Sequence, residues 1–292
     1  MVATLKREGR RTVRVFAVAV ALLGAVLSAT AGEVVIPVVA WDAHGVGTNR
    51  WSTELYLSNT ASQQALVAVA AALPLRVVQQ VPCLPPVAPF VVPGYSTRVV
   101  TAAELNRYLG CPGQYVGGLV LDAPPGVVVG TRMTNHKALG EVPEEELLQG
   151  LSQEIPGLPL TALPQPGEEY MLPALGWHPQ PCTGRAQLDT YLYLANPRTA
   201  PVTVTLFDPS GRIQRLSLNR QVVTLPHDLT VPGERLAQFL VAPAPEAMPA
   251  ACGKPGLFDL FFRTDQPVAA LGSVVDRSAQ DARTVLPVVL SR

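Results

Sequence analysis

The sequence predicts an all-β protein made of two β-sandwich domains in tandem, and three observations support this. The chain repeats itself, because Leu55-Tyr56-Leu57-Ser58-Asn59 returns as Leu192-Tyr193-Leu194-Ala195-Asn196, with a Pro-x3-Trp motif ahead of both. Apolar and polar residues alternate as they do in half-buried strands. The chain is also rich in turn residues, with 29 Pro and 23 Gly. The period, the 137 residues from Leu55 to Leu192, far exceeds a solenoid unit of about 20–50 residues, so each copy should have its own core.

Alternation identifies the central strands of each copy. Val202, Val204 and Leu206 are separated by threonines, which places the three apolar side chains on one face of a strand. The segment Ala65–Val69 keeps the apolar positions in the first copy. Asp208-Pro209-Ser210-Gly211, which follows the second strand, is typical of a type I turn.

Each copy is expected to contain one short crossover helix. In the first copy Thr101 and Glu104 form a capping box, and Gly110 ends the helix. In the second copy the segment Leu236–Leu240 has apolar residues at helical spacing. About seven short strands per copy with Pro- and Gly-rich turns then favour a sandwich. An up-and-down barrel is the alternative, although a helix fits better as a plug between two sheets.

The first 31 residues have the pattern of a secretory signal peptide. Five basic residues precede the apolar run Val15–Leu27, and Ala29-Thr30-Ala31 offers the small residues that signal peptidase accepts. A retained anchor is the alternative, but a run of about 13 residues is shorter than the roughly 20 that span a bilayer. We therefore expect an exported protein, periplasmic or extracellular, with no transmembrane segment after signal removal.

The two sandwich domains are expected at residues 32–140 and 169–292, joined by a linker at 141–168. The linker and its edges are acidic, with seven Glu and no Lys or Arg between residues 141 and 170. Pro143 and the glutamates after it can begin a short helix whose apolar stripe reaches Ile155. A Pro-containing spacer then follows. A partner-binding segment is the alternative interpretation.

Charge and cysteine content restrict the class of protein. The leader holds five of the 22 basic and one of the 22 acidic residues, so the mature chain has 17 basic and 21 acidic groups and a net charge of −4. A mildly acidic chain without a basic cluster is not typical of a nucleic-acid binder.

Four cysteines in an exported chain predict two disulfides. Cys83 and Cys111 lie in the first copy, and Cys182 and Cys252 in the second, which favours one disulfide in each. A metal site is the alternative, but only His178 and Cys182 are close in sequence, and zinc ligands normally come as two close pairs.

The sequence contains no recognisable catalytic motif. It has no nucleophile elbow, zinc-protease motif, phosphate loop or dinucleotide fingerprint, and none of its four histidines has an acid and a nucleophile nearby in a familiar pattern. A triad assembled from distant loops stays open. We expect no enzymatic activity, no cofactor and no metal.

Three aromatic residues are candidates for a contact surface. Tyr56 and Tyr193 alternate with core leucines, so they should face outward or toward a neighbouring element. Phe90 lies in a Pro-rich apolar loop, which either covers its domain or recognises a partner. Trp41 and Trp177 could stack on sugars, but their recurrence favours packing.

The order of motifs in each copy is an apolar-Pro strand, a Gly- or Trp-containing loop, a Leu-x-Leu-x-Asn strand, a Val-Thr-Val-type strand and a Gly-led strand pair. This order resembles the tandem immunoglobulin-like β-sandwich modules of exported bacterial proteins of uncharacterised function. The resemblance covers nearly all of the mature chain. It implies an immunoglobulin-like scaffold and no catalytic residues.

The sequence therefore predicts a non-enzymatic structural, adhesive or binding protein of the bacterial cell envelope or exterior, with an unknown protein or glycan partner. Such scaffolds bind through end loops or an exposed sheet edge. The alternative is a secreted hydrolase or carbohydrate-binding accessory protein with a site at the domain junction. A cleft lined by paired acids would support that alternative, and a convex apolar junction would oppose it.

Overall fold

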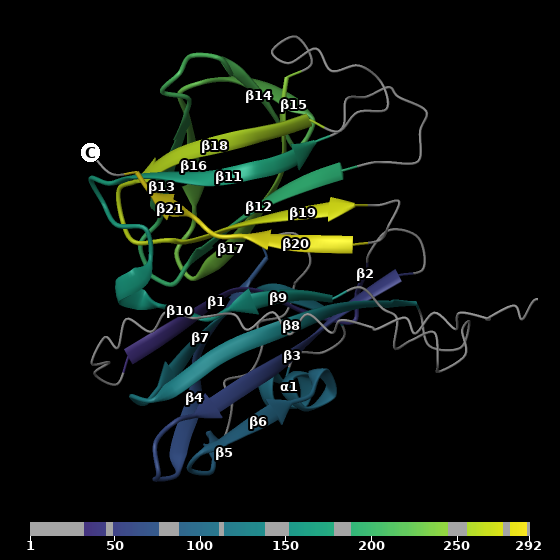
Figure 1. The fold of residues 1–292 in the computed structure, drawn as a ribbon, viewed down its shortest axis with the longest axis vertical. Helices are drawn as coiled ribbons and strands as arrows, with labels where there is room; N and C mark the ends of the chain where they lie inside the picture. Colours follow the sequence, from purple (N-terminus) through teal and green to yellow (C-terminus); the bar gives the residue numbers. More distant parts are fainter. Residues whose placement is uncertain are drawn as a thin grey trace, which may run out of the picture.

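The structure is a computed structural model that describes residues 32–44, 49–75, 88–110, 114–137, 152–177, 188–244, 256–276 and 281–290. These residues are almost all in strands, which confirms the all-β class. They form a first half, up to residue 163, and a second half that follows it. In Figure 1 the first half lies below the second. The predicted signal peptide and all four cysteines (Cys83, Cys111, Cys182 and Cys252) fall outside the described residues.

The elements of the first half are, in chain order, β1 (Gly32–Trp41), β2 (Ala43–His44), β3 (Asn49–Asn59), β4 (Ala65–Pro74), β5 (Phe90–Val92), β6 (Ser96–Val100), α1 (Ala102–Leu109), β7 (Tyr115–Ala123), β8 (Val127–Lys137), β9 (Ser152–Pro156), β10 (Leu158–Pro159) and the 3-10 turn η1 (Leu160–Ala162). Those of the second half are β11 (Glu169–Trp177), β12 (Leu188–Asn196), β13 (Val202–Phe207), β14 (Arg215–Leu218), β15 (Gln221–Thr224), β16 (His227–Val231), β17 (Arg235–Pro243), β18 (Gly256–Thr264), β19 (Ala269–Asp276), β20 (Asp281–Val285) and β21 (Val288–Val289).

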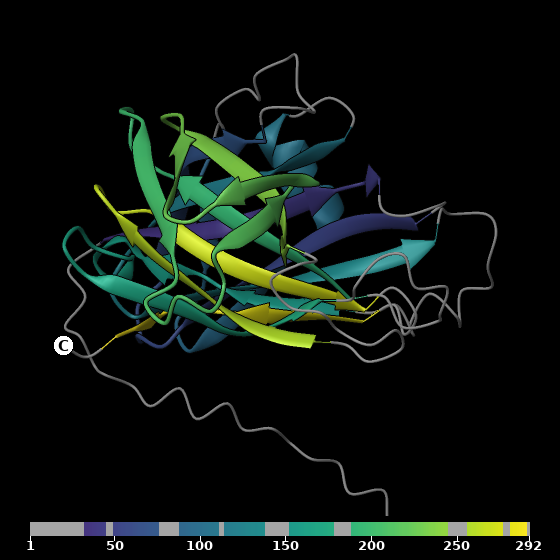
Figure 2. The same ribbon diagram turned by 90° about the horizontal axis from the view of Figure 1, so that it is seen from above.

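Each half is a pair of antiparallel sheets. In the first half the order β10-β1-β7-β4-β5 forms the sheet that faces the second half, which we call the inner sheet. Its outer sheet has the order β2-β3-β8-β9, with β6 paired to β3. In the second half the inner sheet is β15-β14-β17-β12-β19-β20, and the outer sheet is β16-β13-β18-β11-β21. Figure 2 shows the strands of the second half lying across those of the first. The predicted sandwich architecture is therefore confirmed.

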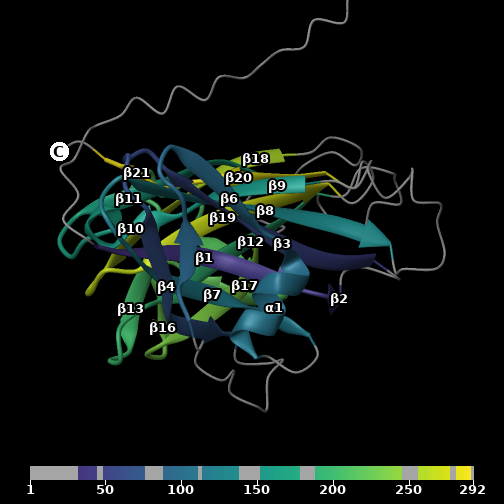
Figure 3. The same cartoon turned by 90° about the horizontal axis from the view of Figure 1, so that it is seen from below.

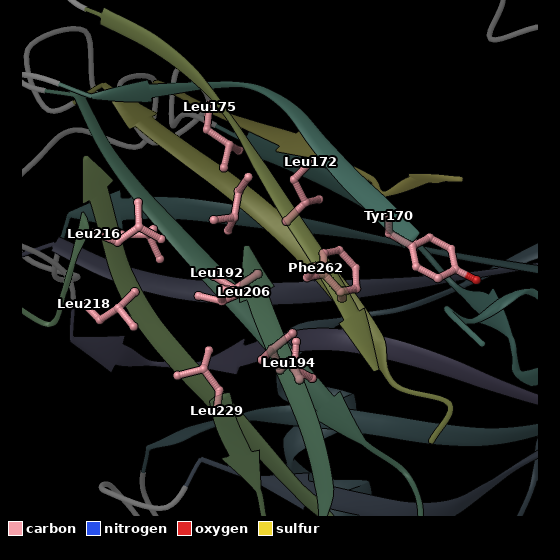
Figure 4. Close-up of a cluster of buried hydrophobic side chains, with 14 of the residues drawn as sticks. Tyr170, Leu172, Leu175, Leu192, Leu194, Leu206, Leu216, Leu218, Leu229 and Phe262 are labelled. Carbon is pink, nitrogen blue, oxygen red and sulfur yellow. The ribbon is translucent and has the colours of Figure 1, made fainter. Parts of the chain in front are cut away.

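Each half has its own hydrophobic core between its two sheets. In the second half, Leu172, Leu206 and Phe262 of the outer sheet meet Leu192 and Leu194 of the inner sheet (Figure 4). The buried and half-buried positions alternate along β13, as the sequence predicts. A separate cluster fills the first half. Burial of a side chain of this kind contributes roughly 1.5–3 kcal/mol, so these alternating positions drive the folding of each sandwich.

The repeat extends to most of the strands in each half. Strands β1, β3, β4, β6, β7, β8, β9 and β10 have the same pairing partners as β11, β12, β13, β17, β18, β19, β20 and β21. The registers agree as well, because Tyr56 pairs with Gly130 where Tyr193 pairs with Leu271. One difference matters below: the strands that form the inner sheet of the first half correspond to those that form the outer sheet of the second.

The strand order departs from the immunoglobulin pattern that the resemblance implied. Pairing of β3 with β6 and of β4 with β7 matches the immunoglobulin pairs B–E and C–F. However, β1 pairs with β7 and β8 pairs with β3, where the immunoglobulin order pairs A with B and F with G. The first and last of these strands have thus exchanged sheets, and the same exchange occurs in the second half.

One of the two predicted helices is present. Helix α1 begins after Thr101, whose hydroxyl accepts a hydrogen bond from the Glu104 amide at 3.2 Å. It ends at Gly110, which has a φ of 60°, and the helix buries Leu105 and Leu109. Figure 3 shows α1 beside β3 at one end of the first half.

The helix predicted in the second copy was wrong, because residues 235–243 form strand β17. Arg235 pairs with Asn196 as Ser96 pairs with Asn59, so β17 is the counterpart of β6 and not of α1. The second half also has the hairpin β14–β15, and β14 pairs with the end of β17. Pairing of Leu236–Leu240 with β12 therefore overrode the helical spacing of their apolar side chains.

The predicted linker was also wrong in part. Residues 152–159 form β9 and β10, which complete the outer and inner sheets of the first half by pairing with β8 and β1. Ile155, assigned to a helical stripe, is a fully buried strand residue. The residues at which that helix was expected to begin lie outside the described part of the chain.

The repeated prolines mark an irregularity in both halves. The pairing of β1 with β7 shifts register between Ile36 and Val39, on either side of Pro37. The pairing of β11 with β18 shifts between Leu172 and Leu175, around Pro173. Because proline has no backbone N–H to donate to the ladder, it is tolerated in a strand at such a bulge.

A buried asparagine closes one corner of the first half. The side-chain nitrogen of Asn59 donates to the carbonyl oxygens of Gln63 at 2.7 Å, Val92 at 3.2 Å and Pro93 at 3.2 Å. Its side-chain oxygen accepts from the amide of Ala61 at 3.0 Å. This one side chain, only 3% exposed, joins the end of β3, the turn to β4 and the end of β5.

Asn196 repeats the arrangement in the second half almost atom for atom. Its nitrogen donates to the carbonyls of Ala200 at 2.8 Å, Val231 at 3.2 Å and Pro232 at 3.2 Å, and its oxygen accepts from the amide of Arg198 at 2.9 Å. An amide is needed here because the site requires a donor and an acceptor on the same side chain. We call Asn59 and Asn196 the corner asparagines.

A glycine completes each corner. A Cβ on Gly94 would lie 2.0 Å from the carbonyl oxygen of Ser62, and one on Gly233 would lie 1.8 Å from that of Thr199. No side chain fits at either distance, so the Pro-Gly pair of each copy is required by this close approach of two backbones.

We predict that Asn196→Asp lowers the free energy of unfolding by at least about 2 kcal/mol, because a carboxylate cannot donate to the three carbonyl oxygens that it would face. Asn219→Asp is the matched control. The Asn219 oxygen accepts from the Leu240 amide at 2.9 Å, and an aspartate keeps that acceptor. Urea denaturation of both variants checks this, and equal stabilities would contradict it.

Candidate functional site

Phe90 does not lie on a surface of the first half. It is 1% exposed, and its ring stacks on Tyr108 with the ring centroids 4.1 Å apart. The Arg98 guanidinium lies over the same ring, 5.3 Å from its centroid. A side chain enclosed in this way offers no area to a partner, and its role is to anchor β5 to the helix.

Tyr193 points away from the core of its own half, as its alternation with the leucines predicts. It lies against the first half, where it is 8% exposed, and Gln238 donates a hydrogen bond to its hydroxyl at 3.3 Å. Tyr56, its counterpart on β3, is half-buried on the outer sheet and donates to a Glu54 carboxylate oxygen at 3.0 Å. Equivalent tyrosines are thus placed in a contact in one half and at the surface in the other.

The contact between the halves is a third hydrophobic cluster, formed mainly by the two inner sheets and joined by Met133 and Ile155 of the first half's outer sheet. Val35, Val38 and Val120 of the first half meet Tyr193 and Leu271 of the second. Strand β1 is consequently buried on both faces, with all six residues from 35 to 40 inaccessible. Within the described residues the junction is filled by side chains, so it does not form the acid-lined cleft that glycoside chemistry would need.

A polar network closes one edge of this contact. The side-chain nitrogen of Gln153, on β9, donates to the Thr284 hydroxyl at 2.8 Å, and its oxygen accepts from the Ser273 hydroxyl at 3.1 Å. The Thr284 hydroxyl donates in turn to the Glu154 carbonyl at 2.6 Å. Gln153 is 2% exposed, so these bonds compensate for its burial and set the position of β20 beside β9.

Burial also changes the acidity of the tyrosines. Desolvation raises the pKa of Tyr193, and the neighbouring Tyr191 adds to the shift. The pKa of Tyr170 rises to about 12, mainly through burial and then through its hydrogen bond to the Glu168 carboxylate. Burial raises the pKa of Tyr115 as well. These hydroxyls therefore stay protonated at neutral pH.

A small hollow of about 260 Å³ lies at one end of the second half. It is lined by Leu188, Leu257, Val274, Asp276, Ala282 and Arg283. One acid and one arginine on an apolar wall do not form an acid–base pair with a nucleophile. Among the residues that the structure describes, no three His, Cys, Asp or Glu side chains gather closely enough to hold a metal ion.

The remaining candidates have structural positions or cannot be placed. Trp177 is buried in the core of the second half, and Trp41 packs against that of the first, which confirms the expected packing. His178 and Cys182 fall outside the described residues. In the described part of the chain no helix is long and apolar enough to cross a membrane.

Comparison with known proteins adds little to this geometry. No family model matches the chain, and no curated protein matches it. Among solved structures, the C-terminal domain of the Streptococcus pyogenes antigen I/II-family protein AspA is similar over 90% of this chain and 100% of that chain, at 8% sequence identity and a TM-score of 0.19. A TM-score of that size carries no argument about fold or function.

We predict that Tyr193→Ser costs about 3 kcal/mol of unfolding free energy, because it leaves a cavity in the contact between the halves. Tyr56→Ser, the same change at the equivalent surface position, should cost less than about 1 kcal/mol. Chemical denaturation followed by tryptophan fluorescence measures both. Equal losses would show that the contact between the halves contributes nothing to stability.

The tyrosines also predict a loss of stability at alkaline pH. Unfolded tyrosine releases its proton at a pH of about 10, whereas Tyr193 in the folded protein holds its proton to a higher pH. The contribution of these tyrosines to the unfolding free energy should therefore be constant below a pH of about 10 and fall above it, by up to about 1.4 kcal/mol per pH unit for each such tyrosine. Tyr193→Phe should make the fall less steep. An identical slope in the variant would contradict the prediction.

Proposed function

We propose that this chain is an exported, non-enzymatic structural, adhesive or binding protein of the bacterial cell envelope or exterior. The observation that carries the proposal is the filled junction. The two inner sheets pack face to face over an apolar cluster and are tied at one edge by Gln153. The halves therefore behave as one stiff body that offers sheet faces, edges and end loops to a partner.

Export is supported by the sequence alone, through the leader and the four cysteines of the chain. The absence of catalysis is likewise a proposal. It is supported by the missing motifs and by the structural hydrogen bonds of three buried polar side chains, the corner asparagines and Gln153. A hydrolase or carbohydrate-binding site at the junction, the alternative function, is opposed by the side chains that fill the described part of the junction.

Cell fractionation and N-terminal sequencing test the location. The proposal requires that the protein leaves the cytoplasm and that the mature chain begins at Gly32. A cytoplasmic chain that retains its leader would overturn it. Screening the purified protein against peptide, ester and glycoside substrates tests the second part, because turnover abolished by one His or Ser substitution would show an enzyme.

We predict that the intact mass of the exported protein, measured without reducing agent, is lower by the mass of four hydrogens than that of the reduced chain, because two disulfides form from its four cysteines. Peptide mapping should place one bridge between Cys83 and Cys111 and the other between Cys182 and Cys252. Free thiols in the exported protein would contradict the pairing.

A further inference from the structure

A row of apolar side chains crosses the exposed face of the second half's outer sheet. Phe207 pairs with Phe261, Phe261 with Met171, and Met171 with Val288, on four adjacent strands. The two phenylalanine ring centroids are 6.1 Å apart, and Val288 is 46% exposed. The residues next to them in the chain, such as Phe262, point into the core (Figure 4). We call these four residues the apolar row.

The same four positions in the first half form the contact with the second half. Their counterparts are Ala71, Val120, Val35 and Leu158, which share one register line across the first half's inner sheet. Val35 and Val120 are 0% and 3% exposed, and Ala71 and Leu158 pack against the same cluster. Within one chain, this line of the first half therefore packs against the other copy of the sandwich, the second half.

We propose that the apolar row is a self-association surface, at which two copies of this protein pack outer sheet on outer sheet and form a closed dimer with two-fold symmetry. This goes beyond the proposed function and does not depend on the identity of any ligand. Phe207 and Phe261 stand where the first half has the smaller Ala71 and Val120. The apolar row therefore has more apolar area than the corresponding line of the first half, which is buried in the junction.

The other partner that the repeat suggests is the outer sheet of the first half, which is the counterpart of the second half's inner sheet. That face has lost the required side chains. Tyr191, Leu271 and Leu236, which pack in the junction, correspond by register to Glu54, Gly130 and Thr97. Val99 and Val128 are exposed on this face, but a head-to-tail stack through it would bury the Glu54 carboxylate, so the symmetric pairing is favoured.

One acid and one base that flank the row are placed to pair with each other in a symmetric dimer, while two further acids, Glu169 and Asp228, lie on the register line of Arg263. Asp259 and Arg263 are exposed on β18, two residues before and two residues after Phe261, and so they share its face. A two-fold axis parallel to the row reverses the strand direction of the second copy. Arg263 of each copy then lies opposite Asp259 of the other, which gives two ion pairs at the rim of the apolar contact.

The face is large enough for a specific dimer. Five strands at about 4.8 Å spacing and some seven residues at about 3.3 Å rise cover on the order of 500 Å² in projection. The accessible area of such a textured face approaches the roughly 800 Å² per partner of a standard interface.

Sedimentation velocity of the mature protein over the micromolar range tests this proposal. We expect a dimer, and we expect Phe261→Arg to sediment as a monomer with an unchanged circular dichroism spectrum. Val128→Arg is the matched control, because Val128 is a 51% exposed strand residue on the first half's outer sheet. It should leave the dimer intact. A wild-type monomer throughout, or dissociation by Val128→Arg, would overturn the proposal.

A charge exchange tests the orientation without touching the apolar residues. Arg263→Asp and Asp259→Arg should each weaken the dimer by roughly tenfold or more, since each places like charges opposite one another. The double variant should restore the wild-type dissociation constant to within about threefold. Because Asp259 also accepts from the Ala174 amide at 2.8 Å, thermal melts must show that each variant is folded. A double variant as weak as the singles would overturn the proposed pairing.

Discussion

The corner asparagines are the interaction on which each sandwich depends. Each lies at the end of a strand, at the turn that leads to the other sheet, and bonds to three backbone carbonyls and one amide, of which the carbonyls of Val92 and Val231 are in buried hydrogen bonds. Asn59 and Asn196 satisfy these groups with one side chain each, at nearly identical distances. Because an unpaired buried polar group costs about 1–3 kcal/mol, this amide is the condition under which the two sheets can close over a dry core at that corner.

The same scaffold presents different faces in its two copies. The register line that is small and fully buried in the first half, at Val35 and Val120, carries Met171 and Phe261 in the second. Conversely, the line that carries Tyr193 and Leu271 in the junction has Tyr56 and Gly130 at the surface of the other half. The positions that face the core stay apolar in both halves. The residues on the opposite face of each sheet differ, and they decide which face packs against another sheet. The fold is conserved between the halves by its core, and the assembly is decided by its surface.

Much of the fold followed from the sequence because its signals are local. Alternation identified the strands, a capping box identified α1, and the repeated Leu-x-Leu-x-Asn motif showed that the halves are copies. The errors arose where pairing at a distance outweighed a local pattern. Leu236–Leu240 has helical spacing but pairs with β12 in a sheet, and Ile155 belongs to a strand paired with β8. Phe90 looked like loop surface because nothing in its neighbourhood indicates that Tyr108 and Arg98 will enclose it. The sequence showed only that the two asparagines recur at equivalent positions, and it did not show which backbone groups they bind.

The asymmetry between the copies also explains why the stack ends. If both halves had kept the junction's two complementary faces, every chain would expose one of each, and head-to-tail contacts would add chains without limit. Glu54 and Thr97 place polar side chains on one of these faces, which opposes that route. The apolar row on the opposite face then pairs with the same row of a second copy. An interface between identical faces closes after two copies. After duplication, the loss of one complementary face thus replaces a contact that could build an open-ended stack with a contact that ends at a dimer.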